Sequence, residues 1–95
     1  MFSPKDPAEI ITLTFDFAAL TLTPTLPVVT VSALTYSADP SPSGILYGSP
    51  AVTGAKITQM IRNGVSGVYY EVTCQVDSGG ERYTMTEVLP VLRQF

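Results

Sequence analysis

Apolar and polar residues alternate with a period of two along much of the chain, which is the periodicity of a β-strand with one buried face. In residues 10–17 every second side chain is large and apolar, namely Ile11, Leu13, Phe15 and Phe17. The residues between them are threonine or aspartate. Residues 28–36 and 55–62 alternate in a similar way and are predicted to form two further strands.

The most regular alternation lies in residues 67–91. Its first half places apolar side chains at every second position: Tyr70, Val72, Cys74 and Val76. Residues 77–80, Asp-Ser-Gly-Gly, are a turn signal and indicate a hairpin. The second half returns with Tyr83, Met85, Leu89 and Val91 on the matching side. Strict alternation would also place Glu87, a charged residue, on this apolar side. We therefore expect a bulge or the end of the strand near Glu87.

Two connecting segments are rich in proline. In residues 18–27, Pro24 and Pro27 interrupt the alternation, and proline cannot donate within a central ladder, so we expect a short edge segment or a wide loop. Residues 37–54 contain many Pro, Ser and Gly around an apolar island at Leu46. The part from residue 39 to 50 has two interpretations: a crossover containing a short strand, or a loop that clamps a neighbouring subunit.

No segment of useful length has the period of a helix. Short strands separated by Gly and Pro turns indicate a single all-β domain, a sandwich or barrel, of about seven short antiparallel strands. We place this domain at residues 10–95 and interpret residues 1–9, which contain two prolines, as an N-terminal arm. We expect the core to include Phe15, Phe17, Tyr70, Val72, Cys74 and Val76.

The amino-acid composition limits the kinds of partner that the protein is expected to bind. Charged residues make up 14% of the chain, against about 25% in typical soluble domains, so a partner is expected to cover part of the surface. The net charge is −3. The basic residues are scattered: Lys5, Lys56, Arg62, Arg82 and Arg93. Nucleic-acid binding needs clustered basic residues and is therefore excluded.

No apolar run approaches the ~20 residues of a membrane helix, and residues 1–10 do not resemble a secretory signal.

Candidate reactive groups are few. The chain has no histidine. Its one cysteine, Cys74, lies on the apolar face of its strand. Because there is no second cysteine, an intrachain disulfide is excluded. Two pairs of carboxylates could serve acid–base chemistry, Asp16 with Glu71 and Asp77 with Glu81, but nothing in the sequence places either pair together in a pocket. A calcium site around Asp39 and Asp77 lacks the dense loop of oxygen ligands that calcium needs. We therefore expect no catalytic residues, cofactor or metal, and predict that the protein is not an enzyme.

Residues 67–74, Gly-Val-Tyr-Tyr-Glu-Val-Thr-Cys, resemble the corner and strand F of immunoglobulin-like domains. The resemblance implies that the ring of Tyr70 lies in the core and that its hydroxyl binds nearby backbone. It also implies that residues 81–91 form strand G. The chain lacks the cysteine pair and the core tryptophan of antibody domains, so the resemblance is to disulfide-free immunoglobulin-like sandwiches.

Nearly the whole chain is also similar to small proteins of tailed bacteriophages and prophages. The similarity lies in Lys5-Asp6-Pro7, in Phe15-Asp16-Phe17-Ala18, in residues 39–42 and 45–50, in the Gly64–Gly67 corner, and in residues 70–74 and 79–82. It implies a virion structural protein, synthesised in the host cytoplasm, of the capsid decoration, minor capsid or head–tail neck type. The implied partner is the major capsid or the head–tail connector protein, and a homo-oligomer, with a trimer as one option, is compatible with it.

Exposed aromatic residues are the candidates for such an interface, because they contribute large contact areas at modest entropy cost. They are Phe2, Tyr47, Tyr69 and Phe95. Tyr69 is also compatible with an ordinary sheet-face position, and the two terminal phenylalanines with packing on their own domain. The alternative function is a virion-displayed module that binds a host-surface glycan or protein, and it requires aromatic residues clustered at one end of the sandwich.

Overall fold

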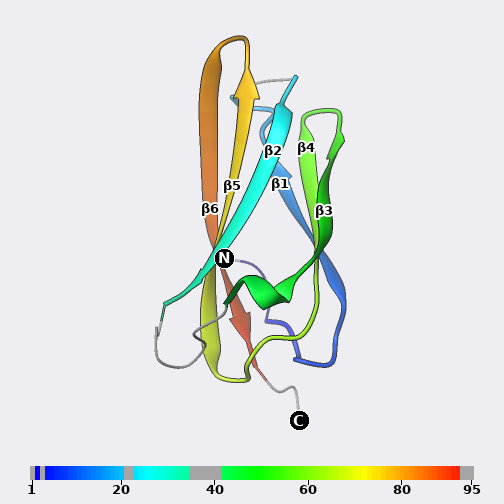
Figure 1. The fold of residues 1–95 in the computed structure, drawn as a ribbon, viewed down its shortest axis with the longest axis vertical. Helices are drawn as coiled ribbons and strands as arrows, with labels where there is room; N and C mark the ends of the chain where they lie inside the picture. The colour runs from blue at the N-terminus through cyan, green and yellow to red at the C-terminus, as the bar shows by residue number, and fades with distance from the viewer. Residues whose placement is uncertain (1, 3, 21–22, 35–41, 93–95) are drawn as a thin grey trace.

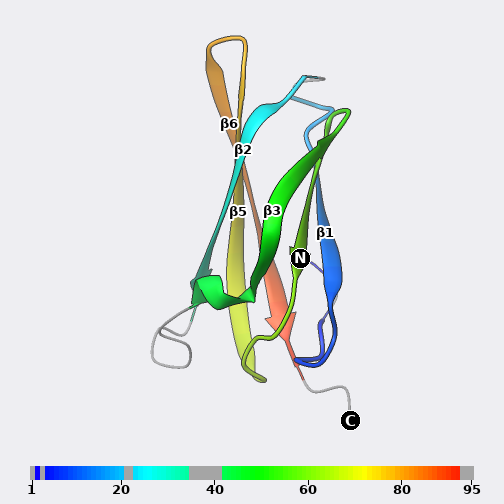
Figure 2. The same cartoon turned by 45° about the vertical axis from the view of Figure 1, so that its right-hand side comes forward.

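The computed structural model describes residue 2 and residues 4–20, 23–34 and 42–92. Its described strands are β1 (Ile11–Asp16), β2 (Thr25–Ala33), β3 (Leu46–Thr53), β4 (Lys56–Ile61), β5 (Val68–Ser78) and β6 (Glu81–Val91), with a short 3-10 turn, η2 (Pro42–Ile45), before β3. The strands form two three-stranded antiparallel sheets that face one another (Figures 1 and 2). The predicted all-β sandwich is confirmed, with six strands in the described residues rather than about seven.

The strand order is that of an immunoglobulin-type sandwich. One sheet has the order β1-β4-β3 and the other β2-β5-β6. These correspond to strands B-E-D and C-F-G of that fold. The position of strand A, beside β1, is occupied by no described strand. The described part of the N-terminal segment instead lies along β6, where Lys5 and Val91 form a parallel bridge.

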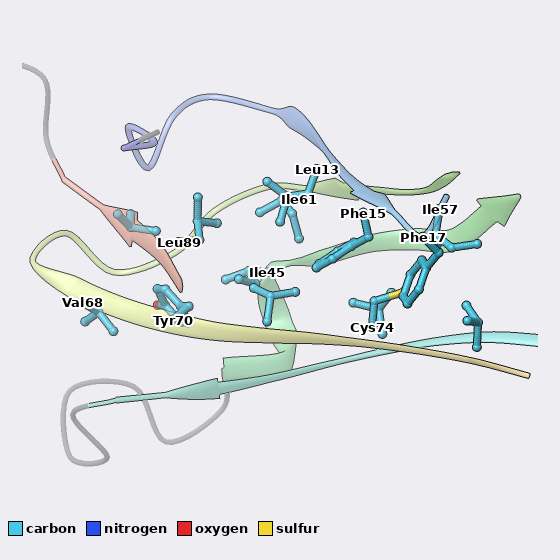
Figure 3. Packing of buried hydrophobic residues seen from close by; sticks show 14 residues of the cluster. Leu13, Phe15, Phe17, Ile45, Ile57, Ile61, Val68, Tyr70, Cys74 and Leu89 are labelled. Atoms are coloured by element: carbon cyan, nitrogen blue, oxygen red, sulfur yellow. The ribbon is translucent and has the colours of Figure 1, made fainter. Parts of the chain in front are cut away.

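The core fills the space between the sheets (Figure 3). The alternating apolar residues of β1, β4 and β5 point inward and are joined by others from β2, η2 and β6. The cluster consists of Leu13, Phe15, Phe17, Val29, Ile45, Ile57, Ile61, Val68, Tyr70, Val72, Cys74, Val76, Leu89 and Val91. All six residues that the alternation assigned to the core lie in this cluster. Cys74 is a free, buried thiol, so hydrophobic packing stabilises the sandwich without a disulfide.

Residues 62–67 form a tight connection that we call the β4–β5 corner. The Tyr70 hydroxyl accepts a hydrogen bond of 2.9 Å from the Val65 N–H. The Gly67 N–H donates to the Val91 carbonyl at 2.7 Å. Gly64 has a φ of +104°, and a Cβ there would lie 3.1 Å from a Val91 methyl group. A side chain at residue 64 would therefore be strained and crowded.

Lys5 is fully buried against this corner. Its ammonium donates to the carbonyls of Asn63 at 2.7 Å and Asp6 at 2.8 Å. Its backbone donates to the Pro90 carbonyl and accepts from the Leu92 N–H. Burial lowers the pKa of the Lys5 ammonium, an effect that nearby carboxylates oppose. The described residues of segment 1–9 thus pack on the sandwich, and the boundary between arm and domain stays a prediction.

The proline-rich segments differ most from expectation. β2 begins at Thr25, earlier than predicted, and its pairing with β5 shifts between Thr25 and Val28. Leu26, within that shift, has a φ of +50°. β3 has eight residues and is longer than the expected short strand, because a second shift between Tyr47 and Ala51 accommodates a turn-like sequence.

Glu87 does not interrupt its strand. The pairing of β5 with β6 is continuous from Val68 opposite Val91 to Ser78 opposite Glu81. The expected bulge is therefore absent, and Glu87 lies opposite Val72 on the side of β6 that faces the other sheet. An inward-directed charge is one way in which proteins protect an edge strand from pairing with another chain.

Two substitutions at Tyr70 separate its packing from its hydrogen bond. Tyr70→Ala removes a fully buried ring and should lower the free energy of unfolding by about 3–5 kcal/mol. Tyr70→Phe keeps the ring but leaves the Val65 N–H without this acceptor, and should lower it by about 1–3 kcal/mol. Urea unfolding followed by circular dichroism measures both. If the phenylalanine variant matches the wild type, the hydroxyl does not stabilise the corner.

Candidate interaction surface

No reactive centre is present in the part of the chain that the structure describes. Its Cys, Asp and Glu residues form no group of three or more that could hold a metal ion. A shallow hollow of about 290 Å³ lies at the β5–β6 turn, lined by Thr25 and residues 77–82. Two of its three charged side chains, Asp77 and Arg82, pair with one another at 2.9 Å, and the third, Glu81, accepts a hydrogen bond from the Tyr83 hydroxyl. The exposed pair stabilises the turn and leaves no group placed for acid–base chemistry.

The candidate carboxylate pairs do not come together. Asp16 and Glu71 belong to β1 and β5, on different sheets, and Asp16 accepts a hydrogen bond from the Ala18 N–H at 2.9 Å. Asp77 binds Arg82, which holds the pKa of the Asp77 carboxyl below its usual value. Glu81 instead accepts from the Tyr83 hydroxyl at 2.6 Å, which raises the pKa of Tyr83. Asp39 lies outside the described residues.

Cys74 is protected from chemistry by its position. Its side chain is fully buried in the core, opposite Val29 and Met85 of the neighbouring strands. Burial raises the pKa of the Cys74 thiol to about 11. Because the thiolate is the nucleophilic form, this thiol is inert at neutral pH.

The central part of the outer face of the β2-β5-β6 sheet carries little charge. We call it the threonine face and define it by Val28, Thr30, Ser32, Tyr69, Glu71, Thr73, Gln75, Thr84 and Thr86. Thr30, Thr73 and Thr86 lie side by side across the three strands, and the hydroxyls of the last two are 3.0 Å apart. Glu71 is the one charged residue of this set. Asp77 and Arg82, at the hairpin end of the same outer face, pair with one another. A neutral surface of this kind can be covered by a partner without desolvating many charges.

Apolar side chains border the same face. Val28 and Tyr69 are 49% and 42% exposed, and Leu34, which follows β2, is 54% exposed. The Leu34 N–H donates to the Tyr69 carbonyl, so these two residues are neighbours. Val28 lies opposite Gln75, nearer the other end of β2, so the apolar cluster consists of Leu34 and Tyr69. An exposed apolar cluster next to neutral polar residues is typical of protein–protein interfaces.

The outer face of the β1-β4-β3 sheet also carries three charged residues. It carries Asp16, Lys56 and Arg62 in addition to threonines. The Arg62 guanidinium lies 4.4 Å from the centre of the Tyr47 ring, a cation–π contact. Tyr47 is 39% exposed, but its ring is already held by this neighbour.

The predicted interface residues are not brought together. Tyr69 lies on the threonine face, and Tyr47 lies on the other sheet. Phe2 is partly buried, and its ring packs edge-to-face on Phe15 with ring centres 5.5 Å apart. Phe95 lies outside the described residues. Tyr69 is therefore the predicted aromatic residue whose position best fits an anchor.

Sequence reasoning missed the aliphatic members of the exposed surface. They include Ile10, Leu20, Leu26, Val28 and Leu34, each at least 49% exposed. One signal was available for Val28 and Leu34. Residues 28–34 carry apolar side chains at both parities, so one set had to remain outside when Val29 was assigned to the interior.

The fold and these surfaces define a small all-β binding module, with no reactive centre in its described residues and with outer faces suited to protein contacts. A family model described as "Podophage GP4 fiber-tail adaptor protein gp77" matches residues 5–90, and the chain belongs to this family. It is a structural protein of the phage virion. No curated protein and no solved structure matches it in the same comparisons. The described residues contain no helix long and apolar enough to cross a membrane.

The buried state of Cys74 gives a direct test of the core. At pH 8 the native protein should react with a thiol reagent far more slowly than the protein in urea, because the thiol is covered and its pKa is raised. Between about pH 9 and pH 11 the unfolded chain loses this proton while the folded chain keeps it, so stability from this group falls as pH rises.

A Thr84→Cys variant provides the matched control, because residue 84 is exposed on the neighbouring strand β6. It should show one fast thiol and one slow thiol in the native state. Equal, fast labelling of both would contradict the burial of Cys74.

Proposed function

We propose that this protein is a non-enzymatic adaptor subunit that joins a tail fibre to the tail of a podophage particle. The observation that carries the proposal is the family match over residues 5–90, since the family is described by that role. The structure supports it, because the described residues offer binding surfaces and no reactive centre. The protein then acts by surface complementarity alone.

This proposal changes the location implied by the sequence resemblance. The resemblance implied one of three roles: capsid decoration, minor capsid protein or head–tail neck component. Each of them places the chain at or near the head, with the major capsid or connector protein as its partner. The family description instead favours the tail and its fibres. The host-glycan alternative gains no support, because Tyr47 and Tyr69 lie on different sheets rather than on one aromatic platform.

We assign the contact with the fibre or tail protein to the threonine face. It combines an exposed anchor at Tyr69 with apolar neighbours and a neutral centre. Its polar groups are hydroxyls that can exchange hydrogen bonds with a partner at small desolvation cost. In the intact virion many copies of such a contact would act together, which multiplies a modest affinity.

Location in the particle tests the function. Virions purified from a phage that encodes this chain should contain it, and gold-labelled antibodies against it should mark the junction of fibre and tail. Labelling spread over the head would contradict the adaptor role and support decoration. Absence of the chain from purified virions by mass spectrometry would exclude any virion role.

Substitution on the threonine face tests the assigned surface. Thr30→Arg places a large charge at the centre of the face and should weaken binding to the purified fibre or tail protein at least tenfold, about 1.4 kcal/mol. Thr53→Arg is the control, because residue 53 is also an exposed threonine in a strand, but on the other sheet. Titration calorimetry with both variants measures the difference. Equal affinities would place the contact elsewhere on the sandwich.

A further inference from the structure

The four edges of the two sheets differ in how well they are protected against pairing with another chain. An unprotected edge presents a row of unpaired backbone groups and is a template for strand addition. On β6, the N–H groups of Phe2 and Lys5 already bind the carbonyls of Val88 and Pro90, and Glu87 points inward further along the strand. β6 is therefore covered at one end and charged beyond it.

The edges of β2 and β3 are interrupted by irregular backbone. β2 contains Pro27, and its register shifts beside Leu26, which has a positive φ. β3 contains Gly48 and Pro50 within its own register shift. Both proline and a bulge are devices that prevent a second chain from forming a continuous ladder.

β1 has none of these protections. Its pairing with β4 runs without a shift from Ile11 to Asp16, and it contains no proline. Residues 10–15, Ile-Ile-Thr-Leu-Thr-Phe, carry no charge. β1 is the edge strand of its sheet and lies at the right-hand margin of the molecule in Figure 2. This margin is also the position that strand A occupies in a seven-stranded immunoglobulin sandwich.

The ladder fixes which backbone groups face this margin. The Phe17 N–H donates to the Ala55 carbonyl, which continues the register of β1 with β4. In an antiparallel pair the hydrogen-bonded residues alternate, so the odd-numbered residues of β1 bind β4. The N–H and C=O groups of Thr12 and Thr14 therefore point outward. Among the described residues, no backbone hydrogen bond outside the ladders reaches them.

We propose that the outer edge of β1 binds the β1 edge of a second copy of this chain, which forms a two-fold symmetric dimer with a continuous six-stranded sheet across both copies. In the antiparallel register that places Leu13 on the symmetry axis, Thr12 of each copy is hydrogen-bonded to Thr14 of the other. Ile11 then lies opposite Phe15. In this register, side chains that face the core in one copy lie opposite side chains that face the core in the other. The β1-β4-β3 sheets of the two copies therefore form one sheet with a common inner face and a common outer face.

The chemistry of the edge favours a second copy. In this register no like charges are opposed, since Asp16 lies opposite Ile10. Leu13 lies opposite Leu13 on the axis, and a pair of threonines lies on either side of it. Ile10 is 58% exposed in the single chain and would be covered by the partner copy. Self-complementarity about an axis is what a two-fold interface requires. This inference does not depend on the proposed function.

Sedimentation equilibrium and amide hydrogen exchange test the pairing together. The purified protein should become dimeric as its concentration approaches about 1 mM, the range of a weak interface. The Thr12 and Thr14 amides should then exchange at least tenfold more slowly than in dilute solution. The Thr84 and Thr86 amides on β6 should not change. A chain that stays monomeric up to this concentration would overturn the proposal.

A matched pair of proline substitutions locates the interface. Thr14→Pro removes an outward N–H without removing a bond to β4, and edge positions tolerate proline. It should abolish the dimer while circular dichroism stays that of the wild type. Thr84→Pro removes an outward N–H from β6 and should leave the dimer intact. Loss of the dimer in Thr84→Pro alone would show that another edge is used.

Two further outcomes are decisive even if Thr14→Pro fails to fold. If the wild type forms a dimer but its Thr12 and Thr14 amides still exchange rapidly, the two copies pair through some other surface. That result would contradict the inference. Protection of these amides only when a fibre or tail protein is added would show that an extended segment of that protein occupies the edge in place of a second copy.

Discussion

Lys5 holds together three parts of the molecule that are distant in the sequence, through its ammonium and its backbone. A buried cation is tolerated only when its hydrogen-bonding capacity is satisfied, and here the acceptors are the carbonyls of Asp6, Pro7 and Asn63. The same residue forms backbone hydrogen bonds with Pro90 and Leu92 at the end of β6. Tyr70 and Gly64 fix the corner from the other side, so the N-terminal segment, the β4–β5 corner and the last strand close the sandwich as one unit.

This closure leaves the outer surfaces to carry function. The inward side chains of β1, β4 and β5 are almost completely removed from solvent, and the buried thiol of Cys74 is chemically silent. Gln59, the other buried polar side chain, donates its amide to the carbonyls of Gly48 and Met60 and thereby stabilises the irregular part of β3. The buried side-chain nitrogen and oxygen atoms of the described residues all have partners. No buried polar group among them is left over for catalysis.

Alternation in the sequence predicted the parts of the fold in which a strand is regular. β1, β4 and the β5–β6 hairpin obey a strict period of two, because one face packs on the core and the other meets solvent. β2 and β3 were placed less well, since their register shifts insert residues that break the period. The burial of Lys5 could not be predicted, because its acceptors include a backbone carbonyl 58 residues away that carries no sequence signal. The same holds for the threonine face, whose hydroxyls come from three strands and become neighbours only when those strands pair.

The two assigned surfaces are compatible because they lie on different sheets. The threonine face is the outer side of β2-β5-β6, whereas the free margin of β1 belongs to β1-β4-β3. Pairing of two copies through β1 would therefore leave both threonine faces uncovered. A dimer with two such faces binds a partner with two sites far more tightly than a single copy does, provided that the spacing of the sites matches. Since the faces are held by rigid sheets rather than by loops, that spacing would be fixed by the β1 register.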